Sequence, residues 1–253
     1  MLGVEEAAAG VAITAALAAI AWKGGALTPA AAAVAWAFGA VIVVGGGFPY
    51  LALLAFFVLA STLATRYRFD QKRQGGVQEG ARGERGISNV VAHILLPAIV
   101  VSISAAAPAV LPASVLSFVY ACAIAFATSD TFASELGVLS GHARSIVTGR
   151  PVPPGTNGGI SGPGEAFAAG GAAATAAVAL GLFLAFGTPI PSAALLLVGA
   201  AIAGFFACQV DSVLGELLEN RGILTKGSTN FLGMAAAIAL GVGILLAAGS
   251  LGW

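Results

Sequence analysis

The sequence predicts an all-α, polytopic integral membrane protein, a single membrane domain over residues 1–253. Of its residues, 58% are hydrophobic and 9% are charged, whereas a soluble domain carries about 25% charged residues. Apolar segments recur along the chain, each close to the length of about 20 residues that a helix needs to cross a bilayer. If these segments span the membrane, every Lys and Arg lies on one side of it. Together these observations disfavour a soluble fold.

Eight segments are candidate membrane-spanning helices: 5–22, 27–45, 48–65, 87–107, 111–129, 165–187, 191–218 and 229–250. The first is short, rich in alanine and headed by Glu5 and Glu6, so a bundle of seven spans is the alternative. Because no Lys or Arg precedes it, we expect a retained helix and not a cleaved signal peptide. The 35 glycines suit helices that pack closely in lipid through small residues.

The cations orient the predicted bundle. With eight spans, all 11 Lys and Arg residues lie on one side, in four places: after the first span (Lys23), between the third and fourth (Arg66, Arg68, Lys72, Arg73, Arg82, Arg85), between the fifth and sixth (Arg144, Arg150), and between the seventh and eighth (Arg221, Lys226). Short cytoplasmic loops are enriched in Lys and Arg. We therefore expect this side to be cytoplasmic and both termini to lie outside a cell membrane, which we take to be prokaryotic.

Composition also limits the partners. The formal net charge is zero, so no overall field attracts a nucleic acid, and we expect membrane lipids as the surroundings. Cys122 and Cys208 lie in apolar segments without a CxxC spacing. We therefore predict buried thiols, with neither a disulfide framework nor a zinc site.

Two long loops on the charged side, 66–86 and 130–165, are the predicted functional regions. The second contains PPGTNGGISGPG, residues 153–164, whose flexible backbone N–H groups could surround phosphate oxygens. The next span begins directly after it, so the positive end of that helix dipole would lie beside the loop. A turn-rich linker without a ligand is the alternative interpretation of this segment.

Polar residues also mark the starts of two further spans on this side. The fourth begins within RGISNVVAH, residues 85–93, and the eighth within KGSTNF, residues 226–231. Ser88 and Ser228 have a structural interpretation as helix N-caps. Asn89, His93 and Asn230 lie within helices in lipid and need polar partners there. We expect His93 to make an interhelical hydrogen bond and not to bind a metal.

Carboxylates mark the ends of the fifth and seventh spans on the same side. Residues 130–136 and 211–217 share the pattern D-[ST]-x-x-small-E-L, which suggests an internal repeat. Acidic residues near the membrane indicate functional sites unless they are paired, so Asp130 and Asp211 are the main candidates. Glu135 and Glu216 follow each Asp by five residues, about 140° around a regular helix. Phosphate and Mg²⁺ suit this set of groups, because Mg²⁺ binds one or two carboxylates together with substrate phosphates.

These motifs resemble those of the DUF92 family of membrane proteins, which includes plant phytyl-phosphate kinase and animal transmembrane protein 19. The matching segments are, in order, RGISNV, DTFASELG, RPVPPGTNGGIS, VDSVLGELLE and STNF, within a likeness that extends from about residue 66 to the C-terminus. The resemblance implies a CTP-dependent kinase that phosphorylates an isoprenoid (prenyl or phytyl) monophosphate to its diphosphate.

With that activity, each predicted site residue has an expected role. Mg²⁺ is expected on Asp130 and Asp211, with Glu135 and Glu216 as outer ligands or water-holding groups. The residues expected to bind CTP are Arg144, Arg150, Thr156, Asn157, Gly158, Gly159, Ser161, Lys226 and Asn230. Those expected to bind the lipid phosphate are Lys72, Arg73, Arg85 and Asn89.

Two other functions remain open. A CTP:lipid-phosphate cytidylyltransferase would use the same groups but release pyrophosphate. A membrane transporter would need polar groups near the middle of the bilayer and a path to both faces. The predicted outer loops are short and uncharged, which favours an enzyme.

Overall fold

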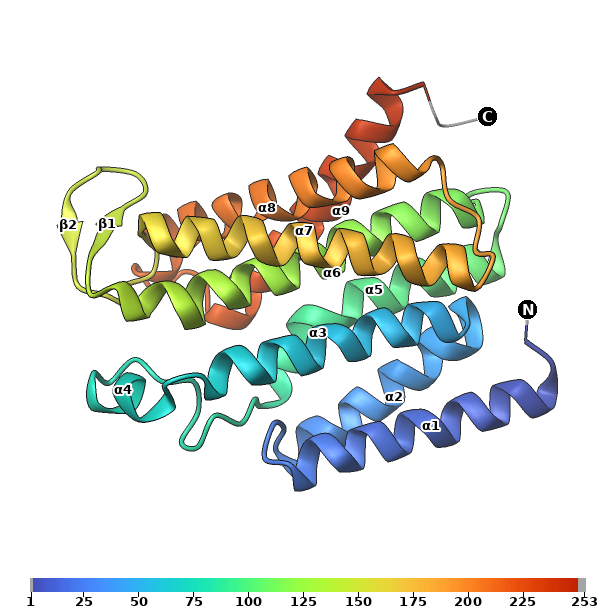
Figure 1. Ribbon diagram of the computed structural model, residues 1–253, viewed down its shortest axis with the longest axis horizontal. Helices are drawn as coiled ribbons and strands as arrows, with labels where there is room; N and C mark the ends of the chain where they lie inside the picture. The colour runs from blue at the N-terminus through green and yellow to red at the C-terminus, as the bar shows by residue number, and fades with distance from the viewer. Residues whose placement is uncertain (1, 250–253) are drawn as a thin grey trace.

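The computed structural model, which describes residues 2–249, is a bundle of long helices with a small sheet at one end (Figure 1). Eight of the described helices are long and apolar enough to cross a membrane. They are α1 (Val4–Lys23), α2 (Pro29–Gly46), α3 (Phe48–Arg66), α5 (Ile87–Ala106), α6 (Ala113–Gly137), α7 (Gly162–Ala185), α8 (Ala200–Leu214) with a π-helical turn at each end, and α9 (Lys226–Ala247). The chain is thus an all-α, polytopic integral membrane protein, and the structure agrees with eight spans.

Local sequence sets several helix boundaries. The Thr28 side chain accepts a hydrogen bond from the backbone of α2, where Pro29 is the first helical residue, a position that suits proline. Ser161 caps α7 in the same way. Thr225 is the N-cap of α9 and forms a capping box with Ser228. The interpretation of Ser88 and Ser228 as N-caps was therefore wrong, since Gly86 is the N-cap of α5.

Helix α6 is the centre of the bundle. Every residue from Leu116 to Ser129 is buried, and α3, α5, α7, α8 and α9 pack around it. Small residues allow this close packing: a Cβ added to Gly204 of α8 would lie 2.6 Å from the Cβ of Ala125. Helix α1 packs mainly against α2 at the periphery (Figure 1).

The two long loops contain structure that the sequence did not predict. Between α3 and α5 lies a short helix, α4 (Phe69–Gln74). After α6, a 3₁₀ turn leads into a three-stranded antiparallel sheet, β1 (Ala143–Ser145), β2 (Pro151–Val152) and β3 (Gly159–Ile160), in the order β2-β1-β3. Arg144 is the register partner of both Pro151 and Ile160.

One predicted boundary was wrong. Residues 130–137, which were expected in a loop, form the last turns of α6, because the carboxylate of Glu135 pairs with Lys72 and Thr65 beside the helix. The sheet, α4 and the ends of α1, α3 and α6 lie at one end of the bundle, and both described chain ends lie toward the other (Figure 1).

Candidate functional site

A cavity of about 180 Å³ lies at the end of the bundle that carries the sheet. Helices α6 and α8 end beside it, and α7 and α9 begin beside it. Residues 154–161, which we call the glycine loop, form one wall. The predicted site residues that line it are Asp130, Thr156, Asn157, Gly158, Gly159, Ser161, Asp211, Lys226 and Asn230. The cavity therefore joins the two aspartates, the glycine loop and two helix N-termini, although these lie far apart in the sequence.

Asp130 and Asp211 are the carboxylates of this cavity that come from the repeated motif. Asp130 lies on α6 with 14% of its side chain exposed, and its Oδ2 is 4.0 Å from Nε2 of His93. Asp211 lies on α8, and its Oδ1 is buried without a hydrogen-bond partner among residues 2–249. A buried carboxylate oxygen without a partner is costly, so this atom is suited to a cationic or protonated ligand.

His93 supports the cavity wall from α5. Its Nδ1 lies 2.9 Å from the carbonyl oxygen of Asn89, which can only accept, so we assign the proton to Nδ1. Its Nε2 then accepts from Nδ2 of Asn230 at 3.4 Å. This contact between α5 and α9 confirms the predicted interhelical hydrogen bond and places Asn230 at the cavity.

Carboxylates attach both the sheet region and the glycine loop to the end of α8. Ser145 donates its hydroxyl to Oε1 of Glu216 at 2.5 Å, and the backbone N–H of Val147 donates to Oε2 at 3.3 Å. Asn157 donates its amide to Oε1 of Glu219 at 2.9 Å. Glu216 thus binds the sheet region but does not itself line the cavity, whereas Glu219 does.

A second loop closes the cavity from the other side. Val77, between α4 and α5, lines the cavity, and Lys226 Nζ lies 2.8 Å from Oε2 of Glu79. Burial raises the pKa of Glu79, but the nearby cations, Lys226 first and then Arg85, together hold this pKa below its usual value. Glu79 is therefore a charged partner of the Lys226 ammonium group.

Two predicted residues form a separate buried pair. Lys72 Nζ is 2.6 Å from Oε2 of Glu135 and also donates to the carbonyl oxygens of Ala64 and Thr65. These three bonds use all the donors of an ammonium group. The structure therefore does not bring Glu135 to the two aspartates, and Lys72 has no donor left for a lipid phosphate. The expected roles of both residues do not fit this geometry.

The four predicted arginines also lie outside the cavity. Arg85 is buried, and its guanidinium lies 3.4 Å from both Asn89 Oδ1 and Thr65 Oγ1. Arg73 is exposed on α4. Arg150 is exposed at the sheet, and Arg144 lines a neighbouring open hollow of about 670 Å³ while donating to the carbonyl oxygen of Gly149.

Glu219, Glu79 and Val77 were not predicted as site residues. A π-helical turn spans Gly215–Glu219 and adds about one residue to that turn. Glu219 then lies about 20° from Asp211 around the helix, whereas a regular helix would separate them by about 80°. The sequence pattern gave no sign of this turn, and only the pairing with Lys226 identifies Glu79.

The residues fit Mg²⁺. Among residues 2–249, no group of three or more His, Cys, Asp and Glu side chains is placed to hold a metal. Mg²⁺ does not need such a group, since it commonly binds one or two carboxylates and takes its other ligands from substrate phosphates and water. Asp130 and Asp211, with the unpartnered Oδ1 atom, meet that requirement.

Comparisons with known proteins agree with this architecture. The profile of the family described as integral membrane protein DUF92 matches residues 12–230. An uncharacterized membrane protein of Synechocystis is 35% identical over 202 residues, covering 76% of this chain and 73% of the relative. One from Methanocaldococcus jannaschii is 35% identical over 201 residues, covering 78% and 76%. Protein PGR of Arabidopsis thaliana is 31% identical over 195 residues, covering 70% and 66%. No solved structure matches the chain.

Proposed function

Because the chain belongs to the DUF92 family of integral membrane proteins, we propose that it is a CTP-dependent kinase that converts an isoprenoid monophosphate to its diphosphate at the cytoplasmic membrane face. The observation that carries this proposal is the meeting of Asp130 and Asp211 in one cavity with the glycine loop. The resemblance of the motifs supplies the nucleotide and the acceptor.

The reaction needs little covalent chemistry from the protein. A non-bridging oxygen of the acceptor phosphate attacks the γ-phosphorus of CTP, a new P–O bond forms, and the bond to the β,γ-bridging oxygen breaks. The electron pair leaves on CDP. The acceptor oxygen is already anionic, so no general base is required. Catalysis then depends on the positioning of the two substrates and on neutralisation of the phosphate charge.

The cavity residues can supply both. Backbone N–H groups of the glycine loop and the N-termini of α7 and α9 suit phosphate oxygens, and Lys226 adds a cation at the same wall. Asp130 and Asp211 would hold Mg²⁺, which when bound supplies charge neutralisation for the phosphates. Glu219 fixes the glycine loop at the end of α8, and Glu216 fixes the neighbouring sheet there, so the N–H groups of the loop stay in position.

Product analysis with a panel of substrates tests the proposal. Purified protein is incubated with Mg²⁺, each of the four nucleoside triphosphates and a series of prenyl monophosphates. The expected result is CDP and a prenyl diphosphate, with CTP the preferred donor. Formation of pyrophosphate and a CDP-lipid would identify a cytidylyltransferase. Movement of a prenyl phosphate across the membrane without chemical change would identify a transporter.

A further inference from the structure

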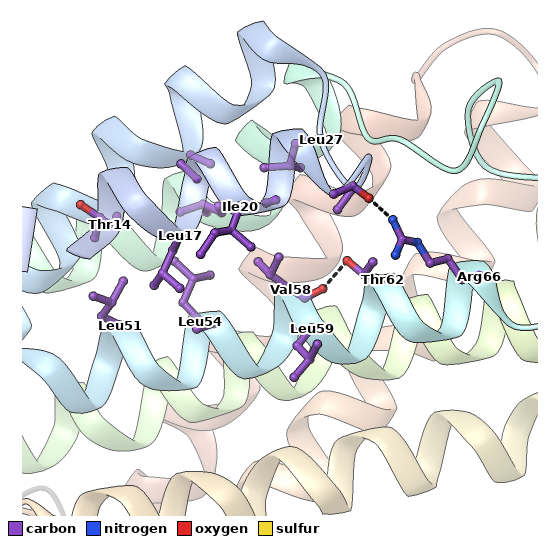
Figure 2. Close-up of a pocket in the computed structure, with 18 residues that line it drawn as sticks. Thr14, Leu17, Ile20, Leu27, Leu51, Leu54, Val58, Leu59, Thr62 and Arg66 are labelled. Atoms are coloured by element: carbon purple, nitrogen blue, oxygen red, sulfur yellow. Dashed lines mark hydrogen bonds between the residues drawn. The ribbon is translucent and has the colours of Figure 1, made fainter. Parts of the chain in front are cut away.

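A second cavity, of about 390 Å³, lies between α1, α2 and α3, and Ile94 of α5 also lines it. Figure 2 shows its lining, which is apolar along the second half of α1 and most of α3, with Arg66 at one end. Thr14 and Thr62 also line it, but their hydroxyls donate to the carbonyl oxygens of Val11 and Val58 in their own helices. Its volume falls within the range of about 300–1,000 Å³ typical of ligand sites.

This cavity, which we call the α1–α3 groove, opens toward the membrane. Leu17 and Ile20 of α1 and Leu59 of α3 line it and are themselves exposed. All three lie in membrane-spanning helices, where lipid surrounds the protein. Unfilled apolar space forfeits dispersion contacts, so a hydrocarbon chain is the occupant that this lining favours.

The charged end of the groove lies at the same end of the bundle as the site. Arg66 ends α3 and is exposed, and its Nη2 donates to the carbonyl oxygen of Gly24. Ala26 and Leu27 also line this end. Arg85 is held directly beside them, because its backbone N–H donates to Ala26 at 2.9 Å and its carbonyl accepts from Thr28 at 3.1 Å. The guanidinium of Arg66, which suits phosphate oxygens, thus lies at one end of an apolar groove. The backbone of Arg85 lies beside the same end, and its buried guanidinium contacts Thr65 and Asn89.

Arg85 also connects the groove to the site. Its guanidinium contacts Asn89, and one turn later His93 lies 4.0 Å from Asp130. Phe57 stacks on His93 with ring centroids 5.6 Å apart, and the next residue, Ile94, lines the groove. A thin wall of side chains therefore separates the groove from the cavity of the aspartates.

We propose that the α1–α3 groove binds the hydrocarbon chain of a single-chain lipid monophosphate whose phosphate lies between Arg66 and Arg85. This inference rests on the proposed function in one respect: the bound lipid is the phosphoryl acceptor. The phosphate of such an acceptor would lie at the charged end of the bundle, where the site is, while its chain remains in an apolar environment.

Photo-crosslinking in phosphatidylcholine nanodiscs tests the groove directly. A prenyl monophosphate with a diazirine on its chain should label peptides of α1 and α3 that contain groove residues. Ala18→Phe, which fills the groove, should lower this labelling about tenfold or more, since the lost chain burial is worth at least that factor. Ala16→Phe is the matched control, because Ala16 is exposed on the same helix outside the groove, and its labelling should equal that of the parent.

A second variant, Ala55→Phe on α3, tests the same groove should Ala18→Phe not remain monodisperse. Equal labelling of Ala18→Phe or Ala55→Phe and the control, or labelling confined to other helices, would overturn the proposal. The proposal would also fail if dioleoyl phosphatidic acid displaced the probe as effectively as unlabelled prenyl monophosphate does. The groove would then bind bulk anionic lipid.

Phosphoryl transfer, measured on the same samples, separates the two proposals. If Ala18→Phe still transfers the phosphoryl group and its KM for the prenyl phosphate equals that of the parent, the lipid site in the groove is refuted. The proposal of a kinase would remain. The opposite outcome is that the parent protein transfers no phosphoryl group, yet its groove is labelled and Ala18→Phe loses this labelling. That outcome would support the lipid site and refute the kinase.

Discussion

The ammonium nitrogen of Lys72 lies 2.6 Å from Oε2 of Glu135, and neither side chain is more than 7% exposed. This pair joins α4 to α6, and Lys72 also binds two carbonyl oxygens near the end of α3. Thr65 donates to the other oxygen of Glu135 at 2.9 Å. The pair thus fixes the loop that leads to Arg85.

Breaking this pair should destabilise the protein. Lys72→Met and Glu135→Leu each leave one buried charge without a partner, which costs about 3–5 kcal/mol. The double variant should cost clearly less than the sum of the two. Thermal unfolding in detergent measures all three, with Arg73→Met, exposed on the same helix, as a control near the parental midpoint. Additive losses would show that the two residues do not interact.

The glycine loop should not tolerate a side chain at residue 158. Gly158 has φ +78°, and an added Cβ would lie 2.4 Å from the Cβ of Glu216. Gly158→Ala must therefore move the loop away from α8, and we expect a stability loss above about 1 kcal/mol together with impaired turnover. Gly162→Ala is the control, because a Cβ there meets open space. Parental stability and turnover in Gly158→Ala would contradict the packing.

Nucleotide and lipid phosphate should respond to different cations. Lys226 lines the cavity, whereas Arg85 lies beside the α1–α3 groove. A charge-assisted contact is worth about 1.5–3 kcal/mol, so Lys226→Gln should raise the KM for CTP about tenfold or more. Arg85→Gln should instead raise the KM for the prenyl phosphate. Steady-state titration of both substrates with each variant measures these KM values. The opposite pattern would show that the nucleotide and lipid subsites are assigned the wrong way round.

The orientation of the bundle can be tested by cysteine labelling. In a background without Cys122 and Cys208, cysteines at Ala109 and Pro189 should react from outside the cell, because the outer loops hold no cation. Cysteines at Ala81 and Val147, which are exposed at the charged end, should react only after permeabilisation. Labelling of residue 81 or 147 in intact cells would invert the proposed topology.

The helices were predictable because the bilayer fixes their length and composition. Each predicted span overlaps an observed helix, and most differ by a few residues at their ends. The main exception is α6, which continues to Gly137. There the pairing of Glu135 with Lys72, 63 residues away, stabilises a polar helix end that hydropathy assigns to a loop.

The site was predictable in part for the same physical reason. Parallel helix ends brought Asp130 and Asp211 to one side of the membrane, so their type and position were enough to group them. Glu219 was missed because a π-helical turn rotates it toward Asp211. Pairings such as Lys226 with Glu79, 147 residues apart, depend on tertiary packing that no local pattern records.

The central claim is that Asp130 and Asp211 support phosphoryl transfer from CTP, and position-labelled CTP tests it most directly. With γ-³²P-CTP, Mg²⁺ and a prenyl monophosphate, the label should appear in the prenyl diphosphate. Asp130→Asn and Asp211→Asn should each slow this transfer about a hundredfold or more, because each removes preorganised charge from the cavity, while Asp70→Asn, exposed on α4, should not. Label released as pyrophosphate, or near-parental transfer by a monodisperse Asp211→Asn protein, would contradict the account.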